Sequence, residues 1–192
     1  MGNSEATRAK ILKAALAEFS TYGIAGARVD RIAKNAGCNK NLIYIYFGSK
    51  EKLFSTTLEK TLTPVYQEMH FTPEDLPGFA ARVFDFAMAN PETMRLMAWL
   101  ALEGKPDSLP ERARIRNERI AHLREAQKSG LIDDRFPPGF LFAATLALAT
   151  TWSAASPFGP SLDPESTKRP AALRRNIAEA VGLLSGSKKP SK

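Results

Sequence analysis

Residues 37–47 read GCNKNLIYIYF, and the last six of these residues are all large and apolar or aromatic. Asn39 is a favourable N-cap, so we expect a short helix over residues 40–46. Successive residues of a helix are rotated by about 100° around its axis. One stripe of this helix therefore carries side chains suited to packing against the rest of the protein, namely Ile43, Tyr46 and Phe47.

The opposite face of this helix is unusual for a surface that meets only water. It carries Lys40, Asn41, Tyr44 and Ile45. An asparagine amide can bind the edge of adenine in two places, and an aliphatic side chain packs on the methyl group of thymine. Lysine and tyrosine side chains bind phosphate oxygens. This combination indicates a helix that enters a groove of a nucleic acid.

Two further helices are expected before this stretch. Residues 4–22 repeat apolar residues at spacings of three and four and stop at Gly23. Residues 29–36, VDRIAKNA, place apolar residues along one side, and Gly37 ends the segment. A short helix, a tight turn and a second short helix form a helix-turn-helix, whose second helix lies in the major groove of DNA.

The positive charge of the chain is concentrated near its start. The 192 residues carry a formal net charge of +7. Residues 1–50 contain eight Lys and Arg against three Asp and Glu, whereas residues 51–192 contain nineteen against seventeen. A basic segment attached to a nearly neutral remainder indicates contact with a polyanion. On charge alone, a basic face that is merely solvated is an equally good interpretation.

The composition argues against several classes of protein. No apolar run reaches the roughly 18 residues of a membrane span, and no signal-peptide core is present, so we expect neither membrane insertion nor export. Cys38 alone cannot form an intrachain disulfide, which fits a reducing, cytoplasmic setting. His70 and His122 do not make a metal-ligand cluster, and no nucleotide-binding loop or hydrolase motif occurs. We therefore expect no metal, no cofactor and no enzymatic activity.

The rest of the chain also has helical patterns, divided by proline and glycine. Ser49 is expected to cap a helix that starts at residue 50 and is ended or kinked by Pro64. Five more helices are expected, over residues 76–89, 92–103, 110–129, 138–155 and 167–184, with SPFGPSLDPES as a linker before the last. The prediction is an all-α protein of about nine helices without strands.

The stretch GARVDRIAKNAGCNKNLIYIYFGSKEKLF, residues 26–54, resembles the N-terminal DNA-binding domain of the tetracycline-repressor (TetR) family. The matching elements are Ile32-Ala33, Ala36-Gly37, Leu42 to Phe47, Ser49-Lys50-Glu51 and Leu53-Phe54. The resemblance covers roughly residues 5–60. It implies a three-helix helix-turn-helix domain over residues 1–49 and a helical effector-binding and dimerisation domain over residues 50–184. We expect a basic, disordered tail over residues 185–192.

The resemblance also assigns roles within the helix-turn-helix, about residues 28–47. It implies that Lys40, Asn41 and Ile45 face base edges and that Tyr44, Tyr46 and Lys50 hold phosphates. Arg28 stands where the family usually has Thr or Ser, which removes a capping hydroxyl and offers a charged phosphate contact. The expected DNA-binding residues are Arg28, Asn39, Lys40, Asn41, Tyr44, Ile45, Tyr46 and Lys50.

By the same resemblance, the protein is expected to be a homodimeric repressor that a small molecule releases from a palindromic DNA operator. The helices near 138–155 and 167–184 are the candidates for the dimer interface. The first is apolar nearly all round, a pattern that fits the centre of a bundle and a subunit interface equally well. Aromatic and sulfur-containing side chains with a histidine are candidates for lining an effector pocket: Phe84, Met94, Met97, Trp99, His122 and Trp152.

Two other functions stay open on the sequence alone. An all-helical enzyme would use Glu103 with Arg95 or His122 in the C-terminal core. A constitutive DNA-binding adaptor would recruit a protein and have no effector pocket.

Overall fold

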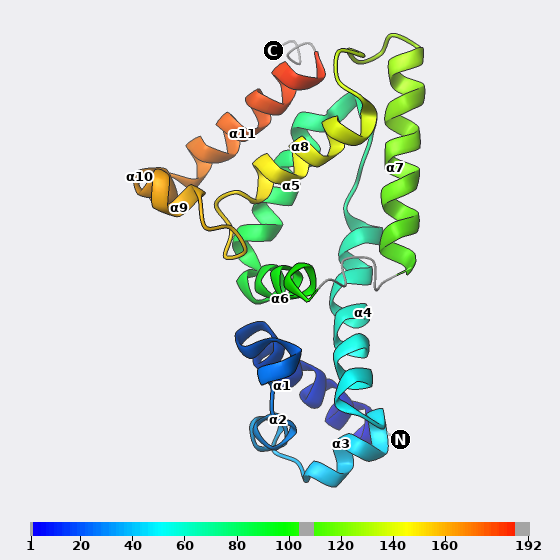
Figure 1. The fold of residues 1–192 in the computed structure, drawn as a ribbon, viewed down its shortest axis with the longest axis vertical. Coiled ribbons are helices and arrows are strands. Elements are labelled where there is room, and N and C mark those ends of the chain that lie inside the picture. Colours follow the sequence, from blue (N-terminus) through cyan, green and yellow to red (C-terminus); the bar gives the residue numbers. More distant parts are fainter. Residues whose placement is uncertain (1, 104–109, 187–192) are drawn as a thin grey trace. The chain divides into compact units, whose positions relative to one another are not determined.

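The computed structural model describes residues 2–103 and 110–186, and within these ranges it contains helices and no strand (Figure 1). Its elements are α1 (Gly2–Gly26), α2 (Val29–Ala36), α3 (Lys40–Phe47), α4 (Lys50–Glu68), the 3-10 helix η1 (Pro73–Asp75), α5 (Leu76–Ala89), α6 (Pro91–Leu102), α7 (Pro110–Lys128), α8 (Pro138–Thr150), α9 (Gly159–Leu162), α10 (Pro164–Thr167) and α11 (Pro170–Ser185). The prediction of an all-α fold is confirmed.

Nine of the α-helices correspond to the nine predicted from the sequence, and the two additional ones lie in the segment predicted as a linker. In α10, the Asp163 carboxylate accepts a hydrogen bond from the backbone N–H of Ser166 at 3.2 Å, and Pro164 occupies the first helical position. An acidic N-cap followed by proline is a helix start signal that the linker interpretation overlooked.

The predicted end of one helix was wrong, and one of the two alternatives at Pro64 is excluded. The helix expected over 138–155 ends at Thr150, because the chain then reverses. At the reversal, Gly159 lies so close to α8 that a Cβ atom there would be 2.5 Å from the carbonyl oxygen of Thr151. Pro64 does not end α4, which continues through it to Glu68.

The described chain divides into two compact units. The first comprises residues 2–65 and 92–103, and the second comprises residues 66–91 and 110–186. The first unit thus contains much of α4 and of α6 in addition to the helix-turn-helix, a grouping that differs from the expected boundary after residue 49. Ser185 is buried as the last residue of α11, and residues 187–192 of the expected tail lie outside the described residues.

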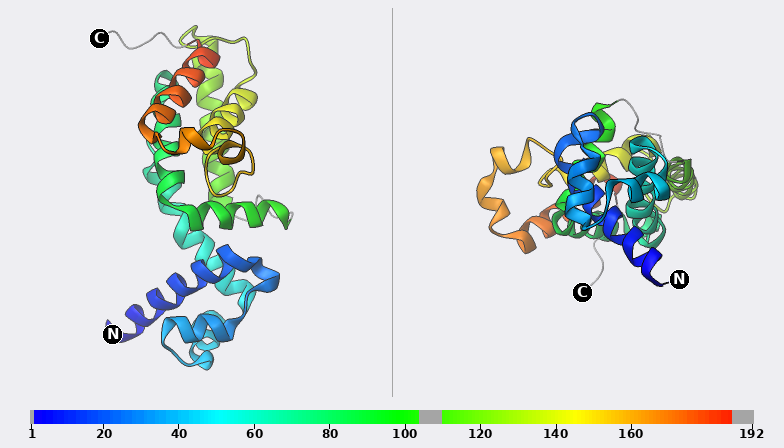
Figure 2. Two further views of the ribbon diagram at one scale, coloured as in Figure 1. Left: turned by 90° about the vertical axis from the view of Figure 1, so that its left-hand side faces the viewer. Right: turned by 90° about the horizontal axis from the view of Figure 1, so that it is seen from below.

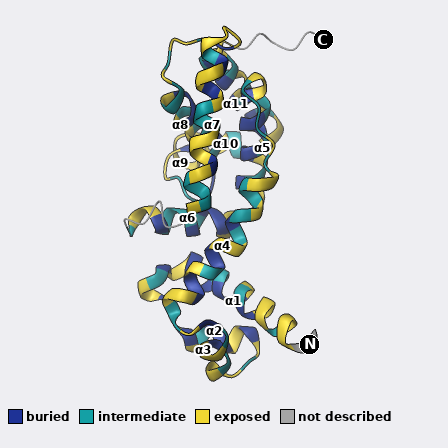
Figure 3. Ribbon diagram, turned by 90° about the vertical axis from the view of Figure 1, so that its right-hand side faces the viewer, coloured by how far each residue is buried: buried dark blue, intermediate teal, exposed yellow. Residues whose placement is uncertain are grey.

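The core of the first unit holds the helix-turn-helix together. Phe19 of α1 meets Phe54 of α4 edge to face, with ring centroids 5.0 Å apart. Helices α1 to α4 contribute fully buried side chains to this core, among them Ile11, Phe19, Ile32, Ile43 and Leu53. In Figure 3 the buried residues of these helices form inward stripes, while the exposed residues lie on the outer faces.

The second unit is a bundle in which α5 packs against both α8 and α11 (Figures 1 and 2). Phe79 of α5 meets Phe71 edge to face at 5.0 Å and stacks on Phe142 of α8 at 6.1 Å. Leu123 of α7 and Val181 of α11 are completely buried in the same cluster. This aromatic and aliphatic core matches the apolar patterns from which the C-terminal helices were predicted.

Helix α1 is interrupted at Gly23, where α6 packs against it. Gly23 has φ 65° and ψ −176°, a backbone conformation that is essentially restricted to glycine. A Cβ atom on Gly23 would lie 2.8 Å from Cε3 of Trp99. The Trp99 indole N–H donates to the carbonyl of Ser20 at 3.2 Å, and the Glu103 carboxylate accepts from the N–H of Ile24 at 3.0 Å. The break in α1 thus creates the contact surface for α6.

We predict that Gly23→Ala destabilises the protein more than Gly37→Ala. Gly37 has a similar φ of 67°, but a Cβ there would meet no atom within 4 Å, so it reports backbone strain alone. We expect a loss of about 1–2 kcal/mol for Gly37→Ala and about 2–5 kcal/mol for Gly23→Ala, where overpacking is added to strain. Urea unfolding of both variants measures the difference, and equal losses would show that the Trp99 contact has no energetic consequence.

Candidate nucleic-acid interface

A buried carboxylate on α1 holds the start of α2. Glu18 is only 4% exposed. Its Oε1 accepts a hydrogen bond from the backbone N–H of Arg28 at 2.8 Å and another from Nε of Arg31 at 2.8 Å. Arg28 is the N-cap residue of α2 and makes no side-chain cap. The carboxylate of Glu18 therefore satisfies an N–H at the start of α2, where a side-chain cap is absent.

Arg31 completes this junction between α1 and α2. Its guanidinium lies over the ring of Tyr22, 4.2 Å from the centroid, and donates to the carbonyl of Gly26 at 3.0 Å. The hydrogen bond to Glu18 raises the pKa of Arg31 above its usual value, which keeps the group charged. One arginine thus joins the end of α1 to the first turn of α2.

The turn between α2 and α3 has the geometry that the sequence predicted. Gly37 is left-handed at φ 67° and ψ 36°, and the N–H of Cys38 donates to the carbonyl of Ala33 at 3.0 Å. The Asn39 side chain accepts from the N–H of Asn41 at 2.9 Å, so Asn39 caps α3 as predicted. Helix α3 then docks on its neighbours through Ile43 and Phe47, which are 1% and 5% exposed.

The opposite face of α3 is exposed, and it carries the four residues predicted to meet DNA: Lys40, Asn41, Tyr44 and Ile45. Ile45 is 76% exposed and Tyr44 is 43% exposed. An isoleucine and a tyrosine so exposed on a short helix make an apolar surface flanked by an amide and a cation. Tyr46 is half-buried, with its ring edge-on to Phe47 at a centroid distance of 6.3 Å.

Both lysines predicted to contact DNA have partners within the protein. Lys40 pairs with the Asp30 carboxylate at 2.9 Å, and this hydrogen-bonded pair raises the pKa of Lys40. Lys50 donates to the carbonyl of Ala27 at 3.3 Å, which ties the start of α4 to the loop before α2. Arg28 is exposed, and its side chain makes no hydrogen bond or ion pair with the described residues.

The roles of Glu18 and Asp30 were not predicted from the sequence, although the position of Glu18 in the apolar pattern of α1 was a usable signal. It lies on the buried side of α1, together with Ile11, Ala15 and Phe19. A carboxylate on such a stripe requires a buried partner. The sequence contains no comparable signal for Asp30, because its pairing with Lys40 depends on the angle between α2 and α3.

The six residues predicted to line an effector pocket divide between the two units. Met94, Met97 and Trp99 lie on α6 in the first unit, where Trp99 packs on the break in α1. In the second unit, Phe84 is buried in the core and His122 is exposed on α7. Trp152 is half-buried, and its indole Nε1 is buried without a hydrogen-bond partner in the described part of the chain.

Comparison with known proteins agrees with this geometry. The model for bacterial regulatory proteins of the tetR family matches residues 11–56, and the model for the tetracyclin repressor-like C-terminal domain matches residues 75–182. The HTH-type transcriptional repressor SCO4008 of Streptomyces coelicolor is 39% identical over 156 residues, which is 80% of this chain and 81% of that protein. The chain belongs to the tetracycline-repressor family.

Further relatives agree with membership of the TetR family. The HTH-type transcriptional repressor NicS of Pseudomonas putida is 34% identical over 102 residues, which cover 50% of this chain and 48% of NicS. The crystal structure of a transcriptional regulator from Streptomyces coelicolor, SCO4942, superposes with a TM-score of 0.82 at 35% identity, covering 95% of this chain and 99% of that one. The present TetR-family chain is thus a DNA-binding transcriptional regulator.

No described helix is long and apolar enough to cross a membrane. Across residues 2–103 and 110–186, no three His, Cys, Asp or Glu side chains lie together as a metal site would require.

We predict that Asp30→Asn strengthens DNA binding about two- to five-fold, because it releases Lys40 from its exposed ion pair and removes a negative charge beside α3. The measurement is fluorescence anisotropy with a labelled duplex at several salt concentrations, and the plot of log affinity against log salt should steepen. The control is Glu59→Asn, which removes the carboxylate of an exposed residue on α4 in the same unit. An unchanged affinity for Asp30→Asn would show that Lys40 does not approach DNA.

Proposed function

We propose that this TetR-family regulator is a homodimeric repressor that binds a near-palindromic operator through α3 and is released by a small-molecule effector. The observation that carries the proposal is the division of α3 into two faces. Ile43 and Phe47 hold one face in the protein, while Tyr44 and Ile45 on the other face are exposed to solvent. A helix held this firmly presents its outer face in a defined orientation to the major groove.

The outer face of α3 contains groups for both kinds of DNA contact. Asn41 and Ile45 would read base edges, the amide by hydrogen bonds and the aliphatic group against thymine methyls. Lys40 would face base edges at the same surface. Tyr44 would bind phosphates, as would Lys50 and Arg28 beside it. Lys50 donates one hydrogen bond to the Ala27 carbonyl, and its ammonium group has two further donors for a phosphate.

The proposed dimer uses exposed apolar surface on α8 and α11. Phe140 and Leu183 are 55% and 77% exposed, which is high for large apolar side chains. On α8, Ala143 and Ala147 are exposed one turn apart, and small residues permit close approach of a second helix. Two subunits joined there would place their α3 helices in half-sites about 34–36 Å apart if these lie one turn apart.

Release would follow from a shift between two conformations of the dimer. An effector that binds the conformation with the wrong spacing of α3 helices lowers DNA affinity by the ratio of its two affinities. The indole N–H of Trp152, buried and without an acceptor in the described residues, supports a ligand contact in the second unit. A buried donor left unpaired costs about 1–3 kcal/mol, and a bound acceptor would remove that cost.

Selection of binding sites from random duplex DNA tests the proposal directly. The purified protein should enrich a near-palindromic consensus whose two halves are separated by about one helical turn. Enrichment of single half-sites would contradict the dimeric mode of binding, and enrichment of nothing would contradict sequence-specific binding by this face.

We predict that Asn41→Ala and the double variant Tyr44→Phe, Lys50→Ala have different effects on the selected site. Asn41→Ala should cost about 1–3 kcal/mol and relax the preference at one base pair, because it removes a base contact. The double variant should weaken binding to all sequences similarly and reduce the salt dependence, because it removes phosphate contacts. Titration of a panel of single-base operator variants measures both effects. If Asn41→Ala left the preference intact, Asn41 would not read a base.

We predict that Leu183→Glu converts the dimer into a monomer, because it places a charge in an apolar interface. Leu102→Glu on α6 is a matched control, since Leu102 is also 77% exposed but lies outside the proposed interface. Sedimentation equilibrium at micromolar concentration should show the monomer mass for Leu183→Glu and the dimer mass for Leu102→Glu. The same mass for both variants would place the interface elsewhere.

A further inference from the structure

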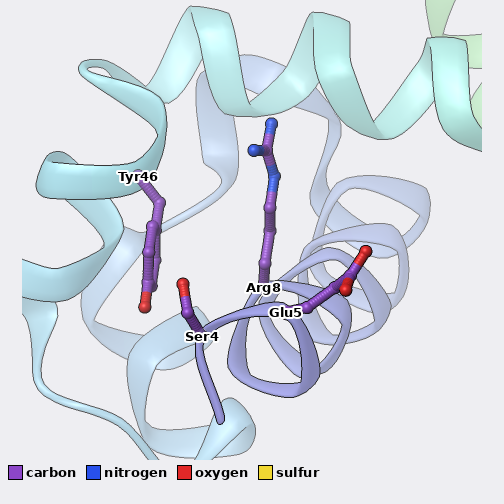
Figure 4. Close-up of a pocket in the computed structure, with 4 residues that line it drawn as sticks. All are labelled: Ser4, Glu5, Arg8 and Tyr46. Atoms are coloured by element: carbon purple, nitrogen blue, oxygen red, sulfur yellow. The ribbon is translucent and has the colours of Figure 1, made fainter. Parts of the chain in front are cut away.

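A surface pocket lies where the first turns of α1 meet α3. It has a volume of about 320 Å³ and is lined by Ser4, Glu5, Arg8 and Tyr46 (Figure 4). Three of these residues come from α1 and one comes from α3. In Figure 4 the Tyr46 ring and the Arg8 side chain stand on two sides of the pocket with Ser4 between them, and the Glu5 carboxylate points away from Tyr46. Neither Glu5 nor Arg8 was singled out from the sequence.

Arg8 supplies a positive charge at this pocket. Its guanidinium lies over the ring of Phe47, 5.2 Å from the centroid, and Phe47 is buried under it. Arg8 as a whole is exposed, and it forms no ion pair with the described residues. A guanidinium stacked on an aromatic ring keeps its N–H donors available in the ring plane for an anion. The cation is therefore held in place by its stacking on Phe47, without an ion pair to a described carboxylate.

Tyr46 and Ser4 add neutral donors to the same wall. The Tyr46 ring is half-buried against Phe47, so its position is set by the packing of α3. Ser4 belongs to the first turn of α1, where backbone N–H groups lack helical acceptors and the helix dipole favours an anion. Together with the guanidinium of Arg8, the two hydroxyls give the lining of this pocket donors for an oxyanion.

The position of the pocket on the molecule indicates the source of that anion. Tyr46 directly follows Tyr44 and Ile45, the exposed residues of the face that we propose enters the major groove. A phosphate of the DNA backbone beside that groove is therefore the anion that α3 itself would bring to the pocket. Glu5 limits affinity for a free anion in solution, whereas DNA would deliver the phosphate together with all other contacts of α3.

We propose that this pocket, built by Ser4, Arg8 and Tyr46, binds a backbone phosphate of the operator at the edge of the site read by α3. The inference rests on the proposed function of α3, and it adds the first turns of α1 to the DNA interface. Arg8 is the charged contact, the two hydroxyls orient the phosphate, and Glu5 opposes it.

The test compares single substitutions on α1, each made in the whole 192-residue chain. Arg8→Gln should lower the slope of log affinity against log salt by about 0.9 for each subunit bound, the value for one lost phosphate contact. Arg8→Lys should keep the slope, and Glu5→Gln should raise the affinity at constant slope. Lys13→Gln removes an exposed cation of α1 outside the pocket and should leave the slope unchanged. Circular dichroism melting of each variant verifies that the first unit is folded.

A second measurement locates the phosphate. Operator duplexes with a single uncharged methylphosphonate at successive positions should include one position at which the wild type loses affinity and Arg8→Gln does not. Inorganic phosphate, compared with chloride at equal ionic strength, should not compete with DNA more strongly for the wild type than for Arg8→Gln. Stronger competition would assign the pocket to a free anion and overturn the proposal.

The outcomes separate this inference from the proposed function. If the wild type binds its selected operator with a steep salt slope, and Arg8→Gln has the same slope, the α3 interface stands and the phosphate pocket is refuted. If the wild type itself shows no specific binding and no salt dependence, the proposed function fails, and the pocket assignment fails with it.

Discussion

The proposed DNA-binding face of this protein depends on one buried carboxylate, that of Glu18. It sits inside the first unit and binds the backbone N–H of Arg28 and the guanidinium of Arg31 at the same time. A carboxylate in this environment is stable only while both partners remain in place, because an unpaired buried charge is costly. The interaction therefore determines where α2 starts and how it lies against α1. The carboxylate of Glu18 on α1 thus satisfies the N–H of the N-cap residue of α2, whose own side chain makes no cap.

The orientation of α3 follows from that of α2 through a short series of local constraints. Gly37 supplies the left-handed residue that ends α2, and Asn39 caps the first turn of α3 two residues later. With both ends of the turn determined, Ile43 and Phe47 reach the core only if Tyr44 and Ile45 point outward. The exposure of Ile45 is unfavourable in water by the hydrophobic effect. This local cost is consistent with a surface shaped for a partner rather than for solvent.

Much of this arrangement could be predicted from the sequence because it depends on residues close together in the chain. The two faces of α3 follow from helical periodicity, and the caps at Asn39 and Ser49 follow from their side chains. The same local reasoning failed for α10, where the Asp163-Pro164 start was overlooked. The roles of Glu18, Asp30 and Arg8 could not be predicted, because their partners lie 10 or more residues away and are set by packing angles. The effector-pocket candidates were chosen by residue type, which does not reveal that α6 packs with α1.

That packing of α6 has a consequence for regulation. Trp99 and Glu103 hold the residues on either side of the break in α1 by hydrogen bonds to Ser20 and Ile24. Gly23 leaves no room for adjustment there, because the indole lies where its Cβ would be. Helix α1 also carries Glu18, which determines the start of α2. If a ligand bound with an affinity that depends on the conformation of α6, this packing would connect it to α1, α2 and finally α3, and by reciprocity DNA bound at α3 would alter the affinity for that ligand. Within the first unit, the contact between Trp99 and Gly23 would be the first link between the two binding events.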